Sequence, residues 1–212
     1  HCVVLTPFSH GITKRMQNED LSIFDYVFCW LGNTNLILSI IKLIEDKMNL
    51  EHDIQEAGVQ MILLVEDSIR FYSSILPNLY NYILEQSKNF SQEALNRHAA
   101  TMRMRGRPKV VLARTYEEAQ KLYDKYSDNT LGVISDARFP LKSAAKAFGN
   151  EVMPEEKPKH RTDTFGREKC PDAGLQLFRY IRKNDPFVPL IIESSESENR
   201  AKAEAEGFRF VD

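Results

Sequence analysis

The chain has 212 residues, of which 42% are hydrophobic and 27% are charged, and this composition suits a globular protein with one or two ordinary cores. The formal net charge of −2 excludes a global electrostatic attraction to nucleic acid or to an anionic membrane. The longest apolar run, residues 36–44, is much shorter than the roughly 20 residues of a membrane span, so we expect no span.

The first fifty residues predict a β-α-β-α unit. Short apolar runs at residues 2–6 and 26–30 are typical of buried strands, and a polar helical stretch separates them. Apolar residues then recur at helical spacing from Asn33 or Thr34 to about residue 50, which predicts a helix. We expect the two strands to pair in parallel through a right-handed crossover, and to be covered by the second unit or by another chain.

The second unit begins with a predicted strand at residues 60–65 that ends in acidic residues, followed by a helix. Pro77 should kink this helix, and the helical pattern resumes after Ser91 to about Met104. An extended helix or a pair of helices is therefore predicted before the next strand, at residues 109–113.

A capping box of Thr115 and Glu118 predicts the start of a helix that runs to Tyr126. The continuous apolar run 131–135 then predicts a parallel strand covered on both faces, and this strand ends at Asp136.

Residues 141–171 contain Pro, Gly, Lys and Glu without a clear period, which predicts an insertion or a mobile loop. We expect the part from Lys142 to Lys169 to be dispensable, because it lacks an apolar face and a long loop costs little closure entropy. The elements expected after it are a helix capped by Asp172 and running to Lys183, a strand at 189–193, a helix at 195–206 with Glu198 completing a capping box, and a last strand at 208–211.

From residue 60 the predicted order is β-α-β-α-β-α-β-α-β, which implies an α/β fold with a doubly wound, parallel, five-stranded sheet. Ligands of such sheets bind beyond the carboxyl ends of the strands. Polar residues follow three of those ends: Glu66 and Asp67, Asp136, and Ser194 with Ser195. We expect them to converge on one rim.

Three segments carry a family resemblance: Leu-Leu-Val-Glu66-Asp67-Ser, Val-Ile-Ser-Asp136-Ala-Arg-Phe-Pro140 and Pro189-Leu-Ile-Ile-Glu-Ser194-Ser195. Over residues 60–212 the chain resembles the receiver domain of response regulators in two-component signalling. The resemblance implies a flavodoxin-like topology with strand order 2-1-3-4-5.

By this resemblance Asp136 is the phosphate acceptor, and Asp67 and Asp136 bind Mg²⁺ directly. Glu66 acts on the ion through water, and the carbonyl of Arg138 supplies another oxygen ligand. The alternative for the acidic pair is that Glu66 and Asp67 merely cap the N-terminus of a helix.

The resemblance also makes Ser194 the switch residue that hydrogen-bonds the new phosphoryl oxygens, and Phe210 the aromatic residue that moves with it. Ser194 could instead be a simple helix cap. Two features depart from the family. The expected lysine at the end of the fifth strand would fall after Asp212, and Arg138 brings a long cation near the metal site, which we expect to point to solvent.

The predicted domains are residues 1–55 and residues 56–212. The first resembles the C-terminal half of a second, degenerate receiver, with Thr6 at its switch position. The second is a receiver with an extended first helix, the insertion at about 141–171, and no last helix. A parent protein with tandem receivers is implied, and the sequence faintly resembles receiver pairs fused to phosphoenolpyruvate synthase-like enzymes.

Two functions follow. The first is a phosphoacceptor module, not an enzyme acting on other substrates, which takes phosphate from a histidine kinase, a phosphotransfer protein or a small acyl phosphate. The second is a pseudo-receiver that serves as a docking or dimerisation platform without phosphorylation. Protein–protein contacts, including a homodimer, are expected in either case.

Other motifs are weaker. Arg105-Gly106-Arg107-Pro108 matches the core of an AT-hook, but the buried strand that follows favours a basic turn, so no nucleic-acid partner is expected. His160 and Cys170 lack a second ligand pair for zinc. Three scattered cysteines fit a reducing compartment, and we expect a cytoplasmic protein.

Overall fold

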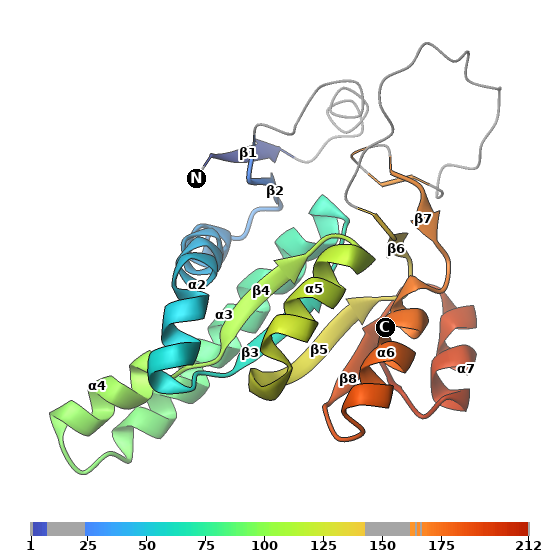
Figure 1. Ribbon diagram of the computed structural model, residues 1–212. Coiled ribbons are helices and arrows are strands. Elements are labelled where there is room, and N and C mark those ends of the chain that lie inside the picture. Colours follow the sequence, from blue (N-terminus) through green and yellow to red (C-terminus); the bar gives the residue numbers. More distant parts are fainter. Residues whose placement is uncertain (1, 8–23, 143–161, 164, 166, 212) are drawn as a thin grey trace.

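The main body of the molecule is a five-stranded parallel sheet flanked by helices (Figure 1). The computed structural model describes residues 2–7, 24–142, 162, 163, 165 and 167–211. The sheet has the order β4-β3-β5-β8-β9, and each neighbouring pair is parallel. Its strands are β3 (Met61–Val65), β4 (Lys109–Ala113), β5 (Thr130–Asp136), β8 (Leu190–Glu193) and β9 (Arg209–Val211). The predicted flavodoxin-like order 2-1-3-4-5 is thereby confirmed.

Helices cover both faces of this sheet, because the side chains of each strand alternate between the two faces. Leu63 of β3 packs with the helices of one face, and Leu64 packs with α3 on the other. Figure 1 shows α5 in front of the sheet and α3 behind it. The helices are α3 (Ile69–Gln92), α4 (Arg97–Arg105), α5 (Tyr116–Tyr126), the 3₁₀ turn η1 (Ser127–Asn129), α6 (Ala173–Asn184) and α7 (Ser197–Ala205). The predicted pair of helices before β4 is present as α3 and α4.

The N-terminal unit contributes a small parallel sheet of β1 (Val3–Pro7) and β2 (Tyr26–Trp30), as predicted. The helix expected between these strands, and the hand of the crossover, lie outside the described residues. The second unit covers β2. The Tyr72 hydroxyl of α3 donates a hydrogen bond to the carbonyl of Val27, and the N–H of Cys29 donates to Ser73 Oγ at 2.9 Å.

Helix α2 (Asn35–Ala57) joins the two units and runs one turn or more past the predicted end. Its Leu43 is buried in the same cluster as α3, whereas Leu50 is buried in the cluster of α5 and α6. The helix therefore lies along the outer edge of β4 and reaches both faces. It ends at Gly58, whose φ of +59° is the left-handed conformation that glycine adopts without strain. The predicted domain boundary at residue 55 falls in its last turn.

Asp46 of α2 also provides a hydrogen-bond acceptor for the edge strand β4. Its Oδ2 accepts a hydrogen bond from the backbone N–H of Val110 in β4, at 3.0 Å. Edge strands that keep free N–H groups invite pairing with other chains, so this contact protects β4.

The described end of the predicted insertion has regular structure that the sequence did not predict. Two short strands, β6 (Phe139–Pro140) and β7 (Lys169–Cys170), pair in antiparallel fashion, and Thr162 bridges Glu168. Residues 143–161 lie outside the described part of the chain.

Two predicted helix caps differ in the structure. Asp172 stands at the N-cap of α6, but its carboxylate pairs with Lys202 at 2.9 Å and makes no capping hydrogen bond, because the nearby ammonium competes for it. Helix α7 begins at Ser197 with Glu196 as N-cap, so the capping box of Ser195 and Glu198 does not form. Within the described residues, none of the helices is long and apolar enough to cross a membrane.

Candidate functional site

Three carboxylates meet at the carboxyl ends of two adjacent strands. Glu66 and Asp67 directly follow β3, and Asp136 is the last residue of its neighbour β5. One carboxylate oxygen from each residue lies within 4.8 Å of the others. The predicted convergence of these acids is present in the fold, because parallel strands end on the same side of a sheet.

Each carboxylate has a different set of hydrogen bonds. Glu66 Oε1 accepts from the N–H of Ser68 at 2.9 Å, which ties this carboxylate to the start of α3. Asp136 Oδ1 accepts from the N–H of Ala137 at 2.7 Å. Asp67 is fully buried, and within the described residues its Oδ1 has no hydrogen-bond partner. A buried, unpartnered carboxylate oxygen normally has an ion or a water to coordinate.

Lys169 supplies the cation of this cluster. Its Nζ lies 2.7 Å from Asp67 Oδ2, and its side chain is only 16% exposed. Lys169, which reaches the acids from β7, was not predicted from the sequence, and the lysine expected after Asp212 is a separate prediction. A two-residue strand has no periodic pattern, so the sequence contains no signal for this pairing. The one hint was that Lys169 lies near the end of the predicted insertion.

The electrostatics reflect crowded negative charge in a buried place. Burial, and then the charges of Asp136 and Asp67, raise the pKa of Glu66 well above its usual range. Burial, and then Asp67, raise the pKa of Asp136 to about 7. Burial also raises the pKa of Asp67, although Lys169 opposes this effect. With all groups ionised, three carboxylates and one ammonium sum to −2, which is the charge that one divalent cation would offset.

The carboxylate oxygens of this cluster are suitable ligands for Mg²⁺. Hard divalent cations prefer carboxylate oxygens, and Asp67 Oδ1 is an oxygen buried without a partner within the described chain. Asp67, Asp136 and Glu66 are the residues that would hold the ion.

The other predicted site residues lie on the neighbouring loops. Ser194 follows β8, is buried, and uses its Oγ to accept hydrogen bonds from Asn199 Nδ2 at 3.0 Å and from the N–H of Glu196 at 3.3 Å. Its Oγ thus accepts the hydrogen bonds of a local turn, whereas the N-cap of α7 is Glu196 rather than Ser194. Phe210 of β9 is half-buried, with the Arg200 guanidinium 5.0 Å from its ring centre.

Arg138, expected to point to solvent, is 30% exposed and pairs with Glu196 at 2.9 Å. This ion pair links the loop after β5 to the loop after β8. Gly174 at the start of α6 lets the helix approach the Asp136 loop, because a Cβ there would collide with the carbonyl oxygen of Asp136. The Gly174 N–H donates to the carbonyl of Ala137 at 3.1 Å.

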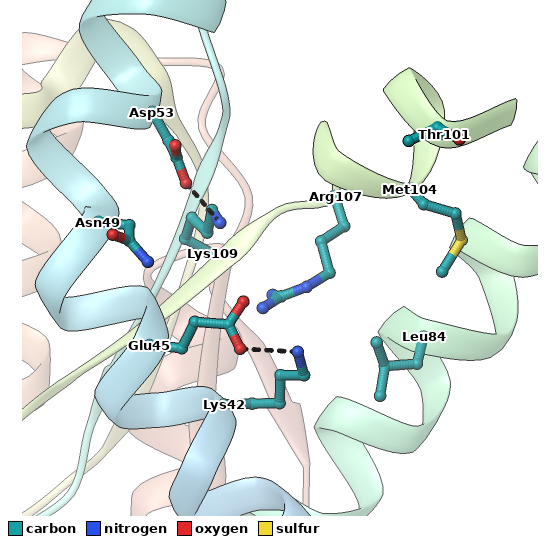
Figure 2. Close-up of a pocket in the computed structure, with 9 residues that line it drawn as sticks. All are labelled: Lys42, Glu45, Asn49, Asp53, Leu84, Thr101, Met104, Arg107 and Lys109. Carbon is teal, nitrogen blue, oxygen red and sulfur yellow. Dashed lines mark hydrogen bonds and ion pairs between the residues drawn. The ribbon is translucent and has the colours of Figure 1, made fainter. Parts of the chain in front are cut away.

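A second cluster of charges lies at the opposite end of β4 (Figure 2). It lines a pocket of about 520 Å³ between α2, α3, α4 and the start of β4. Figure 2 shows Lys42 paired with Glu45 and Lys109 paired with Asp53. Three cations and two carboxylates line the pocket, and Arg107 is paired with the buried Asp46, so each of these cations already has a carboxylate partner within the protein.

Arg107 of the predicted basic turn contributes to the same cluster. Its guanidinium pairs with Asp46 at 2.6 Å and is 5% exposed. A buried and paired arginine is not available to enter a DNA groove, which agrees with the reading of this segment as a turn entering a strand.

Comparisons with known proteins add little. No family model matches the chain, and no curated protein does. Among solved structures, the chain is similar to a response regulator receiver domain protein from Clostridium thermocellum, with 17% sequence identity over 72% of this chain and 81% of that chain, and a TM-score of 0.39. That score is too low to support an argument, so the fold assignment rests on the strand order itself.

Proposed function

We propose that residues 56–212 form a phosphoacceptor receiver module in which Asp136 accepts a phosphoryl group with the help of Mg²⁺. The observation that carries this proposal is the cluster of Glu66, Asp67 and Asp136 at the ends of two adjacent parallel strands, where a buried Asp67 oxygen has no hydrogen-bond partner among the described residues. The sequence resemblance to receivers supports it independently.

The chemistry requires few groups. A carboxylate oxygen of Asp136 attacks the phosphorus of the donor and forms a new O–P bond. The bond from phosphorus to the donor breaks as its electron pair leaves with the donor, which is a histidine nitrogen of a kinase or phosphotransfer protein, or the carboxylate oxygen of an acyl phosphate. Bound Mg²⁺ would supply the positive charge that offsets the phosphoryl oxygens.

In this proposal the chain catalyses only its own phosphorylation and acts in the cytoplasm through protein partners. Ser194 and Phe210 stand at the neighbouring strand ends, where a change at Asp136 can reach the surface of α7 and β9. Arg138 and Glu196 connect the same two loops.

The direct test is incubation with acetyl phosphate and Mg²⁺, followed by intact-protein mass measurement. Asp136→Asn should abolish the added phosphoryl mass and weaken Mg²⁺ binding, because it removes both the nucleophile and a metal ligand. Ser194→Ala should keep metal binding but blunt the conformational response, and Glu66→Gln should be intermediate.

Glu193→Gln is the matched control, because Glu193 is the β8 residue in register with Asp136 and is also a partly buried acid. It should label as the wild type does. Equal labelling of wild type and Asp136→Asn would overturn the proposal.

The second candidate is a docking module without phosphorylation. The Lys169–Asp67 ion pair favours it, since a resident ammonium neutralises part of the acidic cluster without any metal ion. In that case neither Mg²⁺ nor beryllofluoride, an analogue of the phosphoryl group, would bind to the wild-type protein.

A further inference from the structure

Helix α2 has two apolar faces, and only one of them is covered. Its buried face carries Leu36, Leu43 and Leu50, which pack into the cores on the two sides of the sheet. Within the described part of the chain, four further apolar side chains of this helix pack into neither core: Ile37, Ile41, Ile44 and Met48. At 3.6 residues per turn these four point in one direction, about 150° away from the centre of the buried face.

The four residues, which we call the α2 stripe, have the spacing of a seam between two helices. They are separated by four, three and four positions, and this 3.5-residue average repeat keeps a row of side chains facing a partner helix. Ile44 is half-buried and the other three are exposed. Single exposed apolar residues are normal on a protein surface, whereas a contiguous row marks an interaction site.

The stripe is accessible and has a defined end. Figure 1 shows α2 along one side of the molecule, at the outer edge of β4. After Met48 the next seam position is Glu51, which instead pairs with Lys125 of α5 at 3.1 Å. The apolar row therefore covers about three turns of the helix, which is the length that one helix of the same kind would match.

The charges beside the stripe decide the kind of partner. On one flank Lys42 pairs with Glu45 at 2.7 Å, and on the other Lys47 lies 3.9 Å from Asp25. Because both flanks are neutral, the stripe has no electrostatic attraction to a strongly charged protein or to an anionic membrane. A matching partner is another apolar helix face with neutral flanks, and a second copy of α2 has these properties.

We propose that the α2 stripe is the interface between two copies of this chain, packed antiparallel about a twofold axis. The axis passes between Ile41 and Ile44, so that Ile41 of one copy packs against Ile44 of the other. Ile37 then packs against Met48 of the second copy. Each side chain of the stripe thus meets an apolar side chain, as an isologous interface requires.

The flanking residues favour the antiparallel arrangement over the parallel one. In antiparallel helices Glu45 lies beside Leu38 of the second copy, and Lys47 lies beside Ile40. Like charges are therefore kept apart across the interface. In parallel helices Lys47 would instead approach His52 of the second copy, which brings two basic side chains together.

Sedimentation velocity of the full chain, over a roughly hundredfold range of protein concentration, measures this association. The wild type should pass from monomer to dimer. Ile41→Glu should weaken the association on the order of a hundredfold, because it places two carboxylates at the centre of an apolar interface. The variant should unfold in urea as the wild type does, since Ile41 is 56% exposed and glutamate is a good helix former.

Met102→Glu is the matched control, because it makes the same change at a residue of α4 that is 53% exposed. It should dimerise as the wild type does. A wild type that stays monomeric at every concentration would overturn the proposal, and so would a dimer that Ile41→Glu leaves intact.

Disulfide trapping tests the orientation of the two helices. In a background of Cys2→Ser and Cys170→Ser, the remaining thiol, Cys29, is buried. A mixture of Ile37→Cys and Met48→Cys proteins should give a crosslinked dimer on oxidation. Neither protein should crosslink alone, because the two copies of each position would lie about 16 Å apart along the helix axis. Crosslinking of Ile37→Cys with itself would overturn the antiparallel arrangement.

The proposal does not rest on the proposed function, because the stripe contains no residue of the acidic cluster. Dimers should form equally in EDTA and in Mg²⁺, with wild-type protein and with Asp136→Asn. Loss of phosphoryl labelling in Asp136→Asn with dimers intact would keep both proposals, whereas dimers of a wild type that takes no label would keep this one alone.

Discussion

Asp67 and Asp136 face opposite requirements at the residue scale. A nucleophilic or metal-binding carboxylate must be ionised, yet burial favours its neutral form. Lys169 neutralises one carboxylate of the site, and a bound cation would offset the remaining negative charge. The metal-free protein should therefore be sensitive to pH.

Stability of the metal-free protein should fall as the pH rises from about 4 to 7. Burial raises the pKa of Asp136 from 3.8 to about 7, and that of Glu66 well above its usual range. Between the unfolded and folded pKa values the folded protein binds more protons than the unfolded chain, so its stability is greatest below that window and is lost as pH rises through it. The slope approaches about 1.4 kcal/mol per pH unit for each proton involved.

Urea unfolding at a series of pH values, with EDTA or with Mg²⁺, measures this effect. Asp136→Asn removes one of the titrating groups and should flatten the metal-free curve, and Mg²⁺ should restore stability at pH 8. A wild-type curve that is flat in EDTA would contradict the prediction.

Asp46 is a buried carboxylate outside the candidate site, and its hydrogen bonds join α2 to α3 and β4. It accepts hydrogen bonds from Arg107, Tyr80 and Val110, and its side chain is fully buried. Removing one partner of a buried ion pair leaves an uncompensated charge, which costs about 3–5 kcal/mol. We expect Asp46→Ala to destabilise the protein by that amount in urea unfolding.

An exposed pair gives the matched comparison. Lys121 pairs with Glu117 at 2.8 Å within α5, but its side chain is 74% exposed. Lys121→Ala should cost no more than about 0.5 kcal/mol. Similar losses for both variants would mean that burial of Asp46 is not what gives its ion pairs their weight.

At the scale of elements, the sequence was most informative where burial is continuous. The apolar runs of β3, β4, β5 and β8 predicted a parallel sheet, and the acids after β3 and β5 predicted one rim, because a buried strand must end where its polar residues begin. Thr115 also caps α5 as predicted, with its side chain accepting from the N–H of Glu118.

The failures have a common physical cause, which is that long-range partners decide them. Lys169 lies in a polar stretch and Asp46 on a helix with an apolar pattern, and only the fold shows that Asp67 and Arg107 lie beside them. The cap at Asp172 was lost to Lys202, thirty residues away. Local patterns do not contain this information.

The prediction that the insertion is dispensable applies only to its middle part, because residues near its end make long-range contacts. Its end carries Lys169 and the Asp163–Arg167 ion pair. Replacing residues 145–158 with a short linker should leave the thermal midpoint within a few degrees, because loop closure depends weakly on length. Extending the deletion through Lys169 should change the Mg²⁺ affinity. Scanning calorimetry gives the thermal midpoint of both deletion variants, and titration calorimetry gives their Mg²⁺ affinity. Equal affinities for the two variants would mean that Lys169 has no role at the site.

At the scale of the whole molecule, the two units share one core. Phe28 of β2 and Leu43 of α2 are buried in the same cluster as Tyr72 of α3 and Leu112 of β4. The prediction that the second unit covers the N-terminal strands agrees with this burial. A homodimer is not required to cover β2, although Leu5 of β1 is 43% exposed.

A chain that begins at Gly58 should therefore aggregate or unfold. It would lose Phe28, Leu36, Leu43 and Leu50, each buried side chain worth about 1.5–3 kcal/mol, or roughly 6–12 kcal/mol together. That is comparable to the whole net stability of a typical domain, about 5–15 kcal/mol. It would also expose the edge of β4. Light scattering and urea unfolding check the outcome.

The control is a chain that lacks only residues 2–7, and thus β1. Because β2 keeps its contacts with Tyr72 and Ser73, this shorter deletion should leave a soluble, folded protein. Stable monomers from the chain that begins at Gly58 would show that the two units fold independently.

The bond between α2 and β4 also bears on how the protein is made. Asp46 leaves the ribosome 61 residues before Arg107 and 64 residues before Val110, whose backbone N–H donates a hydrogen bond to it. At roughly 5–20 residues per second, the nascent helix waits about 3–12 s for its partners. During that interval Leu50 lacks α5 and α6, with which it is buried in the folded protein. The N-terminal unit therefore completes its folding only after β4 has been synthesised, and the order of translation does not set the order of folding.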